Sequence, residues 1–553
     1  MKKDILSRLM AMMLALTVVA FVSSCDDEEE TGAAPTITLS EETAQNTPGA
    51  TVSVTLAISA PNGAKTLVVA GVDVDDITLA GEKEVEETVE IVIPTNAVVG
   101  STLTAVFTVI DNKNLSSQPT EFSITVGDPT VVIQGDITTN TTLEANTKYL
   151  LKGKVYVQAG ATLTIPAGTK IFGDKVTQAT LIINRGAKID ARGTASNPII
   201  MTSAGEAGFR NRGDWGGVVI LGKAYTNGSA SSTIEGISAS GSENGLYGPG
   251  TNPAADNDNS GVMTYVRIEF AGIPLSQDNE LNSLTMGSVG SGTQIDHIQV
   301  SYGNDDAFEW FGGSVNHKYL IAYSTIDDDF DTDRGYNGNV QFGLVVRDPA
   351  VADFSGARAW ESSSNNTADV SALPAHGITA RHSAPTFSNV TILGPRLFKA
   401  ANAINGFFQA ALEINTSSGI KVYNSIITGF PTGARWNAAG AQATVSGNLF
   451  ASNGANTAVS GGSVLPSDFA TVNTEVSDVT TIFGPYASGT LYSLTGLGVN
   501  PFQTANSPGL GGFVSPGSAF ETVSYRGGFG TTADANWNYT SGWINFDPIN
   551  AAY

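Results

Sequence analysis

Short apolar runs, separated by Gly and Asn residues, recur from about residue 128 onward at roughly coil-length intervals. The opening runs lie at residues 151–157, 161–165 and 181–183. Each run is too short to be stable as a strand on its own, but stacked coils bury the alternating Val, Leu and Ile side chains in a shared interior. Gly and Asn suit the tight corners, where φ is positive. The pattern predicts a right-handed parallel β-helix over residues 128–553.

Two stretches of this region depart from the rhythm. Residues 227–260 are rich in Ser, Gly, Asn and Asp, which predicts a long loop that emerges from the solenoid. The C-terminal tail is aromatic, with Trp537, Trp543 and Phe546. An uncovered last coil exposes unpaired strand edges. We therefore expect this tail to form a C-terminal cap on the open end of the β-helix.

Residues 35–127 show a different pattern. Val52, Val54, Leu56 and Ile58 alternate with small or polar residues in one run, and similar runs follow after turn-forming residues. Such alternation is typical of half-buried antiparallel strands. We predict an immunoglobulin-like β-sandwich there, without a catalytic constellation. Since the chain has 61 Gly and only 14% charged residues, the whole protein is expected to be all-β.

Charge and cysteine content exclude several function classes. The formal net charge is −24, and such a surface repels phosphate backbones, so nucleic acid is excluded as a partner. Acidic secreted surfaces more often meet cations or neutral ligands such as sugars, although acidity also serves solubility alone. Cys25 is the one cysteine. The sequence therefore excludes an internal disulfide, a thiolate metal cluster and a Cys nucleophile in a folded domain.

The start of the chain has the pattern of a lipoprotein signal peptide, residues 1–24. Basic residues precede an apolar run over residues 9–22, which is too short for a comfortable membrane span, and small residues lead to Cys25. After cleavage such a Cys takes acyl chains, palmitate among them, and several buried chains give lasting attachment. An uncleaved short anchor is the alternative. The acidic stretch that follows, residues 25–34, is expected to be a solvated tether.

One acidic constellation repeats along the chain. Residues 305–313 and 327–335 align without gaps at an offset of 22 residues. One solenoid turn of that length places equivalent residues on neighbouring coils about 4.8 Å apart. The expected stacked pairs are Asp305 with Asp327, Asp306 with Asp328, Glu309 with Asp331 and, inside, Phe308 with Phe330.

Carboxylates at that distance repel one another. Solvent, raised pKa values, Arg334 or Lys318, or a bound cation would relieve the repulsion. Calcium takes about six to eight oxygen ligands in flexible geometry and needs no His or Cys. We predict a calcium site, with side chains that fan into water along a turn ridge as the alternative. Residues 256–258 form a second, weaker candidate. The predicted ligands are Asp305, Asp306, Glu309, Asp327, Asp328, Asp329 and Asp331.

Two aromatic residues lie within or directly after these acidic segments, and four histidines are scattered along the chain. Trp310 and Tyr336 are candidates to offer flat apolar faces to sugar rings, and burial is the alternative for either ring. The sequence contains only four His, and their scatter argues for structural or surface roles and against a zinc site. They are His297, His317, His376 and His382.

The chain resembles a family of Bacteroidota lipoproteins and secreted proteins built on a parallel β-helix. The resemblance covers most of residues 128–553, and the acidic run after Cys25 is similar to the signal that sends Bacteroidota lipoproteins to the outer leaflet of the outer membrane. It implies a lipid-anchored, outward-facing location, and some members accompany TonB-dependent receptors, which are possible partners. The segments that carry it are residues 213–217, 259–262, 265–272, 305–313, 327–338, 525–530 and 543–548.

Parallel β-helices also include pectate lyases and polygalacturonases. Residues 303–306 are similar to the paired acids of polygalacturonases, but no Gly-His-Gly or Arg-x-Lys element follows. Pectate lyases resemble this chain in placing acids, with calcium and an Arg base, on one coil face. Arg as a base needs a strongly depressed pKa, so ion pairing is the rival role of Arg334. The candidate residues of an enzyme are Asp306, Glu309, Asp328 and Arg334.

These observations lead to three hypotheses. The first is a non-catalytic surface lipoprotein that binds a glycan, or docks on an outer-membrane receptor, through an acidic, calcium-loaded face. The second is a polysaccharide lyase or glycoside hydrolase, in which paired carboxylates divide acid and base work. The third is a structural or adhesion protein of the cell surface.

Overall fold

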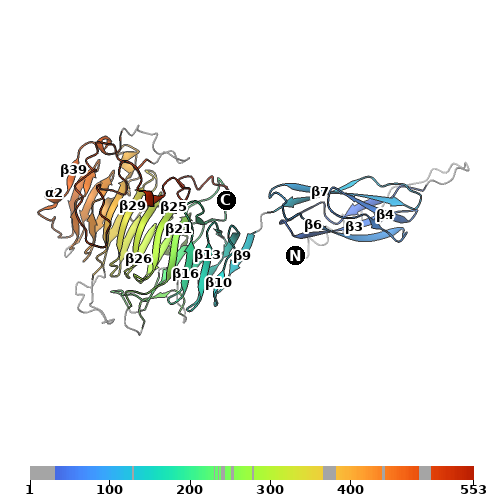
Figure 1. Ribbon diagram of the computed structural model, residues 1–553, viewed down its shortest axis with the longest axis horizontal. Helices are drawn as coiled ribbons and strands as arrows, with labels where there is room; N and C mark the ends of the chain where they lie inside the picture. The colour runs from blue at the N-terminus through green and yellow to red at the C-terminus, as the bar shows by residue number, and fades with distance from the viewer. Residues whose placement is uncertain are drawn as a thin grey trace, which may run out of the picture. The chain divides into compact units, whose positions relative to one another are not determined.

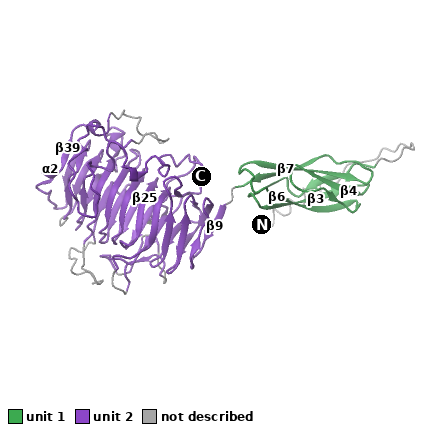
Figure 2. Ribbon diagram, viewed as in Figure 1, with its two compact units in different colours: residues 1–129 green, residues 130–553 purple. Residues whose placement is uncertain are grey.

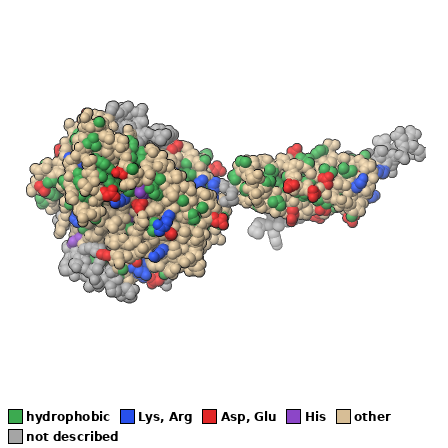
Figure 3. Space-filling model, viewed as in Figure 1, with side chains coloured by type: hydrophobic (Ala, Val, Ile, Leu, Met, Phe, Trp, Pro, Cys, Tyr) green, Lys and Arg blue, Asp and Glu red, His purple; other side chains and the backbone are tan. Residues whose placement is uncertain are grey.

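The computed structural model divides the chain into two compact units, residues 1–129 and 130–553 (Figure 2). The predicted signal peptide, residues 1–24, and Cys25 lie outside the described residues. Most of the visible surface is neutral, in keeping with the low charged fraction (Figure 3). None of the helices that the structure describes is long and apolar enough to cross a membrane. The described residues are 32–127, 130–229, 231–234, 236–237, 243–250, 255–276, 279–364, 382–438, 442–484 and 500–553.

The first unit is a two-sheet β-sandwich. Its strands alternate buried and exposed residues, as β3 does with Val54 and Leu56 inside. Phe107 and Phe122 of the second sheet share the same core. The sandwich and its residues agree with the sequence pattern, while the immunoglobulin-like assignment stays a prediction. One sheet contains β1 (Thr36–Leu39), β3 (Thr51–Ser59) and β6 (Glu84–Val92), and the other β2 (Thr43–Asn46), β8 (Thr120–Val126), β7 (Thr102–Asp111), β4 (Ala64–Ala70) and β5 (Ile77–Thr78).

The second unit is a parallel β-helix (Figure 1). Strands of successive coils pair in parallel and form two sheets. One sheet has ten strands, and the other has seventeen strands and folds over two sides of the solenoid. The ten-stranded sheet contains β12 (Lys154–Val157), β15 (Thr180–Ile183), β18 (Gly217–Leu221), β24 (Leu284–Gly287), β26 (Phe308–Phe311), β28 (Phe330–Asp333), β30 (Trp360–Ser362), β32 (Ala410–Ile414), β35 (Thr432–Trp436) and β38 (Ala455–Val459).

The seventeen-stranded sheet changes character along the solenoid. Early and late coils contribute two short strands each, whereas the middle coils contribute one long bent strand. Its strands are β9 (Thr130–Gln134), β10 (Thr141–Thr142), β11 (Lys148–Lys152), β13 (Thr162–Pro166), β14 (Lys170–Gly173), β16 (Lys188–Arg192), β17 (Ile199–Ser203), β21 (Gly261–Glu269), β25 (Gln294–Ser301), β27 (Asn316–Tyr323), β29 (Asn339–Val346), β31 (Thr386–Leu393), β33 (Lys421–Tyr423), β34 (Ile426–Thr428), β36 (Thr444–Ser446), β37 (Leu449–Ala451) and β39 (Thr474–Val476).

One residue in each long strand makes the bend. Tyr265, His297, Tyr319 and Phe342 lie in register on adjacent coils, with φ between 51° and 66°. Positive φ is costly for bulky residues, so stacking must help to hold them there. Ring centroids of consecutive members lie 4.2, 4.4 and 5.1 Å apart and the rings are stacked. We call these four residues the aromatic ladder.

Stacked side chains fill the interior of the solenoid. Phe308 stacks on Phe330 with ring centroids 5.7 Å apart, as the 22-residue alignment predicts. The last coil is closed by Phe469 of the short helix α2 (Phe469–Val472), which packs against Trp436 and Phe450. The remaining short helices are η2 (Pro395–Leu397), α3 (Thr480–Phe483) and η3 (Ala535–Trp537).

The described parts of loop 227–260 pack against the solenoid. Its hairpin, β19 (Ser232–Thr233) with β20 (Leu246–Tyr247), is antiparallel. Ile234 and Tyr247 are buried in one cluster with Val219, on the outer face of the ten-stranded sheet. A second hairpin, β22 (Pro274–Ser276) with β23 (Asn279–Glu280), follows. The predicted loop therefore leaves the coil rhythm, but its described apolar residues cover a sheet.

The C-terminal segment, residues 500–553, corrects the predicted cap. It lies along the outer side of the seventeen-stranded sheet instead of over its open end. Trp537 and Trp543 meet the aromatic ladder edge-on, with ring centroids 5.1 Å from Tyr319 and 5.5 Å from His297. Further along, the Tyr553 hydroxyl donates to Glu269. The physical reason is that the ladder's rings point outward and present apolar surface that the tail's aromatics bury.

Candidate functional site

The acidic segments meet in the predicted register. Glu309 of β26 lies opposite Asp331 of β28. In the turns before these strands, the Asp328 backbone N–H donates to Asp306 Oδ1 at 2.9 Å. The repeat of 22 residues is therefore one coil, and it brings these carboxylates to one edge of the ten-stranded sheet.

Side chains in the turns bind the backbone of the next coil. Asn282 Oδ1 accepts from the Asp306 N–H at 3.3 Å, and Asp328 Oδ1 accepts from the Arg358 N–H at 2.6 Å. Together with the bond from Asp328 to Asp306, these contacts form a ladder over four coils. Asp306 and Asp328 are consequently held nearly buried, at 7% and 2% exposure.

A row of carboxylates continues on the strands. Glu309, Asp331, Glu361 and Glu413 occupy registered positions on β26, β28, β30 and β32. The next position in register is Arg435, which forms an ion pair with Glu413. We call the four acids the carboxylate row. Their backbones are about 4.8 Å apart, so their charges repel strongly unless something neutralises them.

Arginine neutralises only one end of the row. Arg358 lies 2.7 Å from Glu361, 3.1 Å from Glu413 and 3.5 Å from Asp328. Within the described residues, neither Asp306 nor Asp331 forms an ion pair with Lys or Arg, and the Asp331 Oδ1 is buried without a hydrogen-bond partner. Among the described residues, the negative charge of Asp331 in this row is therefore without a Lys or Arg partner.

Oxygen atoms at that end have the spacing of a cation site. One group consists of Asp305, Asp306 and Asp327, and a second of Asp306, Glu309 and Asp331, with the ligand oxygens of each group within 4.8 Å of one another. Calcium–oxygen distances of about 2.3–2.6 Å place opposite ligands roughly 5 Å apart. Asp306 belongs to both groups. The residues present therefore fit a divalent cation with oxygen ligands.

The raised pKa values of these acids reflect their burial and the repulsion between their charges. Burial first, then the neighbouring Asp305 and Asp328 charges, raise the pKa of Asp306 well above its ordinary value. Burial, with Glu361 and Asp333 nearby, does the same to the pKa of Asp331. Burial also raises the pKa of Asp327 to about 7. Near neutral pH these carboxyls need either a proton or a cation.

The first group opens to the surface. A hollow of about 260 Å³ is lined by Asp305, Asp327, Asp353 and Phe354, among others. Phe354 is 68% exposed, so its ring is available beside the acids. In the floor of the hollow, Asp327 Oδ1 is buried without a hydrogen-bond partner. A ligand in this hollow would lie beside both the oxygen atoms of the first group and the Phe354 ring.

Several predicted site residues lie elsewhere. Asp329 is fully buried and belongs to neither group, and its Oδ1 lies 3.0 Å from Arg347. Arg334 pairs with Asp333 at 3.3 Å, so the Arg beside the acids is Arg358 instead. Lys318 pairs with a glutamate of the C-terminal segment.

Trp310 and Tyr336 are both fully buried, which corrects their assignment as surface platforms. Their rings stack inside the solenoid with centroids 5.2 Å apart, and Trp310 Nε1 donates to His317 at 2.9 Å. Trp310 faces the interior because it alternates along β26 with the outward Glu309. Tyr336 lies in the turn after β28, and its hydroxyl donates to the Val315 carbonyl at 2.8 Å. Neither ring can meet a sugar.

The second acidic candidate and the histidines also have local partners. Asp258 Oδ2 accepts from the Lys223 N–H at 3.1 Å, and Asp256 belongs to neither oxygen group. Burial lowers the pKa of His317 to about 3, so this ring is a neutral core residue. His382 lies near a serine, at 3.4 Å from Ser364. His376 lies outside the described residues.

Sequence reasoning missed Arg358, Glu361, Glu413 and Phe354. Glu361 comes 30 residues after Asp331, and Glu413 comes 52 residues after Glu361, so a search at a fixed period does not align them. Insertions between coils change the sequence distance but leave the strand register intact. A weak signal existed in the acid that directly follows a large apolar residue in both Trp360-Glu361 and Leu412-Glu413.

Fold and site together define a parallel β-helix protein with a partly buried carboxylate row whose oxygen groups fit a divalent cation. The family model described as a pectate-lyase-like β-helix domain matches residues 135–485. The chain belongs to this family. Neither a search of curated proteins nor a search of solved structures found a match.

Proposed function

We propose that this protein is a non-catalytic, lipid-anchored surface protein whose calcium-loaded acidic face binds a glycan. The observation that carries the proposal is the pair of oxygen groups that share Asp306, with the buried and unpartnered Asp331 Oδ1 at one of them. The lipid anchor at Cys25, and a location on the outer membrane of a Bacteroidota cell, rest on the sequence. Docking on a TonB-dependent receptor is the other use of the same face.

Calcium suits the donor set better than other common ions do. The two groups offer carboxylate oxygens only, whereas zinc in proteins is usually bound through Cys or His. Magnesium demands octahedral geometry and keeps several waters, which a buried set of crowded carboxylates does not favour. The turn bonds from Asp306 and Asp328 to the next coil hold the donors in place before an ion arrives.

The surface hollow is the reason for proposing a glycan as the ligand. A cation held by Asp305 and Asp327 keeps coordination positions open toward the hollow, where hydroxyl or carboxylate oxygens of a sugar can complete them. The exposed ring of Phe354 supplies a flat apolar surface next to these positions. The combination recognises a molecule with both oxygen ligands and apolar ring faces.

Calorimetric titration of calcium into the calcium-free protein tests the cation site. We expect one or two calcium ions per chain, and Asp306→Asn is expected to weaken binding about tenfold or more because it removes charge from both groups. Asp190→Asn is the matched control, since Asp190 lies on another sheet and pairs only with exposed Arg192. Equal affinity in wild type and Asp306→Asn contradicts the assignment.

Glycan binding is then measured with calcium and with EDTA. Acidic and neutral polysaccharide fragments serve as probes, and Phe354→Ala tests the aromatic contact. We expect binding that EDTA abolishes and that Phe354→Ala weakens about tenfold. Binding that persists unchanged in EDTA excludes the cation-mediated mode.

A polysaccharide lyase or hydrolase is the second candidate, because the family is pectate-lyase-like and several acids have raised pKa values. Arg358 is the arginine that this arrangement would use beside Asp328. An assay for new reducing ends and unsaturated products separates the two proposals. Turnover that disappears in Asp306→Asn favours the enzyme, and binding without turnover favours the binding protein.

A further inference from the structure

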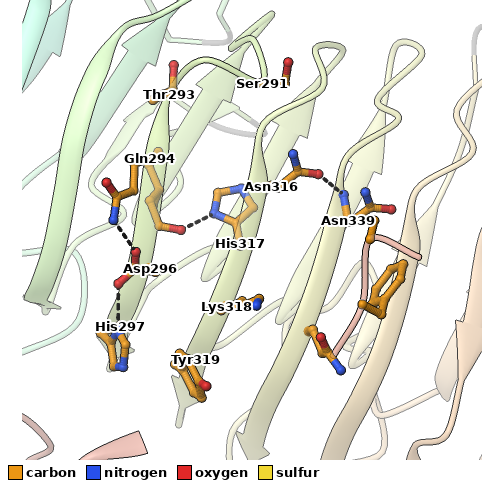
Figure 4. A pocket seen from close by; sticks show the side chains of 14 residues that line it. Ser291, Thr293, Gln294, Asp296, His297, Asn316, His317, Lys318, Tyr319 and Asn339 are labelled. Atoms are coloured by element: carbon orange, nitrogen blue, oxygen red, sulfur yellow. Dashed lines mark hydrogen bonds and ion pairs between the residues drawn. The ribbon is translucent and has the colours of Figure 1, made fainter. Parts of the chain in front are cut away.

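A second hollow lies on a different face of the solenoid. Its volume is about 390 Å³, and its floor is the outer surface of β25, β27 and β29 before their bends (Figure 4). The C-terminal segment forms one wall with Phe520. The volume falls within the range of small-molecule sites, about 300–1,000 Å³. None of the carboxylate-row residues lines it.

The floor of this hollow consists of polar side chains in register. Gln294 lies opposite Asn316, and the Asn339 N–H donates to Asn316 Oδ1 at 2.9 Å, so the three amides form a row across three strands. Three strands span about 10 Å, which is the scale of one or two sugar rings. Neither the Asn316 amide nitrogen nor the Asn339 side chain has a protein partner within the described residues, and Figure 4 shows both at the hollow.

The charged groups of the hollow already have hydrogen-bond or ion-pair partners. Asp296 accepts from the Gln294 amide at 2.9 Å, and its other oxygen lies 2.6 Å from His297 Nδ1. Lys318 forms an ion pair with Glu521 of the C-terminal segment. A charged ligand would have to break one of these pairs, so the hollow favours a neutral molecule.

Phe520 adds an aromatic side chain to the lining of the hollow. The hollow thus combines amides that both donate and accept with an aromatic side chain in a space of sugar size. Neutral saccharides combine hydroxyl groups with flat apolar ring faces, and each part has a counterpart here. We propose that this hollow is a second carbohydrate site, which binds a neutral saccharide of one or two rings without a cation.

Calorimetric titration in EDTA tests this site apart from the acidic one. The probes are neutral di- and trisaccharides of glucose, mannose, galactose and xylose, with oligogalacturonate as the charged comparison. We expect at least one neutral probe to bind in EDTA, and to bind equally to Asp306→Asn. The double variant Asn316→Ala/Asn339→Ala and the single variant Phe520→Ala are each expected to weaken it about tenfold.

Matched controls are Asn402→Ala and Phe209→Ala, since Asn402 is exposed and Phe209 is 75% exposed, and neither lines the hollow. Circular dichroism and thermal melting verify that each variant is folded, and Phe520→Ala leaves the floor untouched. The inference is overturned if no neutral probe binds in EDTA, or if the floor and wall variants bind as well as their controls. Failure of calcium binding at the acidic face leaves this result unaffected.

Discussion

Asp306 connects the parts of the acidic face. It accepts the Asp328 N–H and contributes to both oxygen groups, so a single carboxylate takes part in the coil-to-coil ladder and in the candidate cation site. Such a residue cannot be assigned to stability or to binding alone. Variants must therefore be judged by folding and by calcium affinity together.

The pH dependence of stability follows from Asp327. Its pKa in the folded protein is about 7, above the ordinary 3.8, so the folded state holds this proton more tightly than the unfolded state does. The stabilisation of the folded state by protonated Asp327 is complete at low pH and is lost as the pH rises through about 7. We expect the melting temperature of the calcium-free protein to fall between about pH 5 and about pH 8, and calcium to raise it more at the higher pH. An effect of calcium that does not depend on pH contradicts this linkage.

Asp329 is expected to behave differently from its acidic neighbours. Asp329→Asn leaves Arg347 as a fully buried charge without its anionic partner, which costs about 3–5 kcal/mol of unfolding free energy. Calcium affinity is expected to stay within about twofold of wild type, because Asp329 belongs to neither oxygen group. Urea unfolding and calcium titration measure the two quantities. Asp190→Asn, in an exposed pair, is expected to cost less than about 1 kcal/mol.

At the scale of elements, the aromatic ladder and the C-terminal segment depend on each other. The ladder's outward rings need a cover, and the aromatic residues of segment 500–553 pack on them. Side-chain amides of Gln299, Gln341 and Asn389 also donate to backbone carbonyls of the segment. Within the segment, Trp537 donates its Nε1–H to the Gly528 carbonyl at 2.8 Å.

Trp537→Ala is expected to release this segment. Loss of a fully buried Trp costs about 3–5 kcal/mol, and here the cost is expected to appear as local opening. Hydrogen exchange should rise in residues 500–553 while the core strands β26 and β28 keep their protection. Phe209→Ala, which removes an exposed ring, serves as the control. Unchanged exchange in the segment, or uniform loss of protection, contradicts the local mechanism.

At the scale of the whole molecule, the chain separates into two units with separate cores. The sandwich core and the solenoid core share no cluster among the described residues. The fragment 32–127 is therefore expected to fold alone, and the fragment 130–553 to keep its calcium affinity within about twofold. Calorimetric melting of the fragments and of the full chain tests this, since independent units give transitions that add. A large shift of either transition in the full chain shows coupling.

Much of the architecture could be predicted from the order of residues. The change from period-two alternation to coil-length runs separates the sandwich from the β-helix, and the gap-free repeat at 22 residues predicts the stacking of Phe308 on Phe330 and of Glu309 on Asp331. These features are local or periodic. Strand pairing in a solenoid connects residues one coil apart, so a regular coil length is enough to predict neighbours.

Only the tertiary structure decided which side chains complete the sites. Glu361, Glu413 and Arg358 reach the acidic face across insertions that change the sequence spacing but not the register. Trp310 is turned inward by the alternation of β26, and Tyr336 by the turn after β28, where its hydroxyl donates to the Val315 carbonyl. The C-terminal segment covers the aromatic ladder because that ladder exists only after the coils have stacked. Contacts of this kind depend on surfaces that folding creates, and no local pattern in the chain records them.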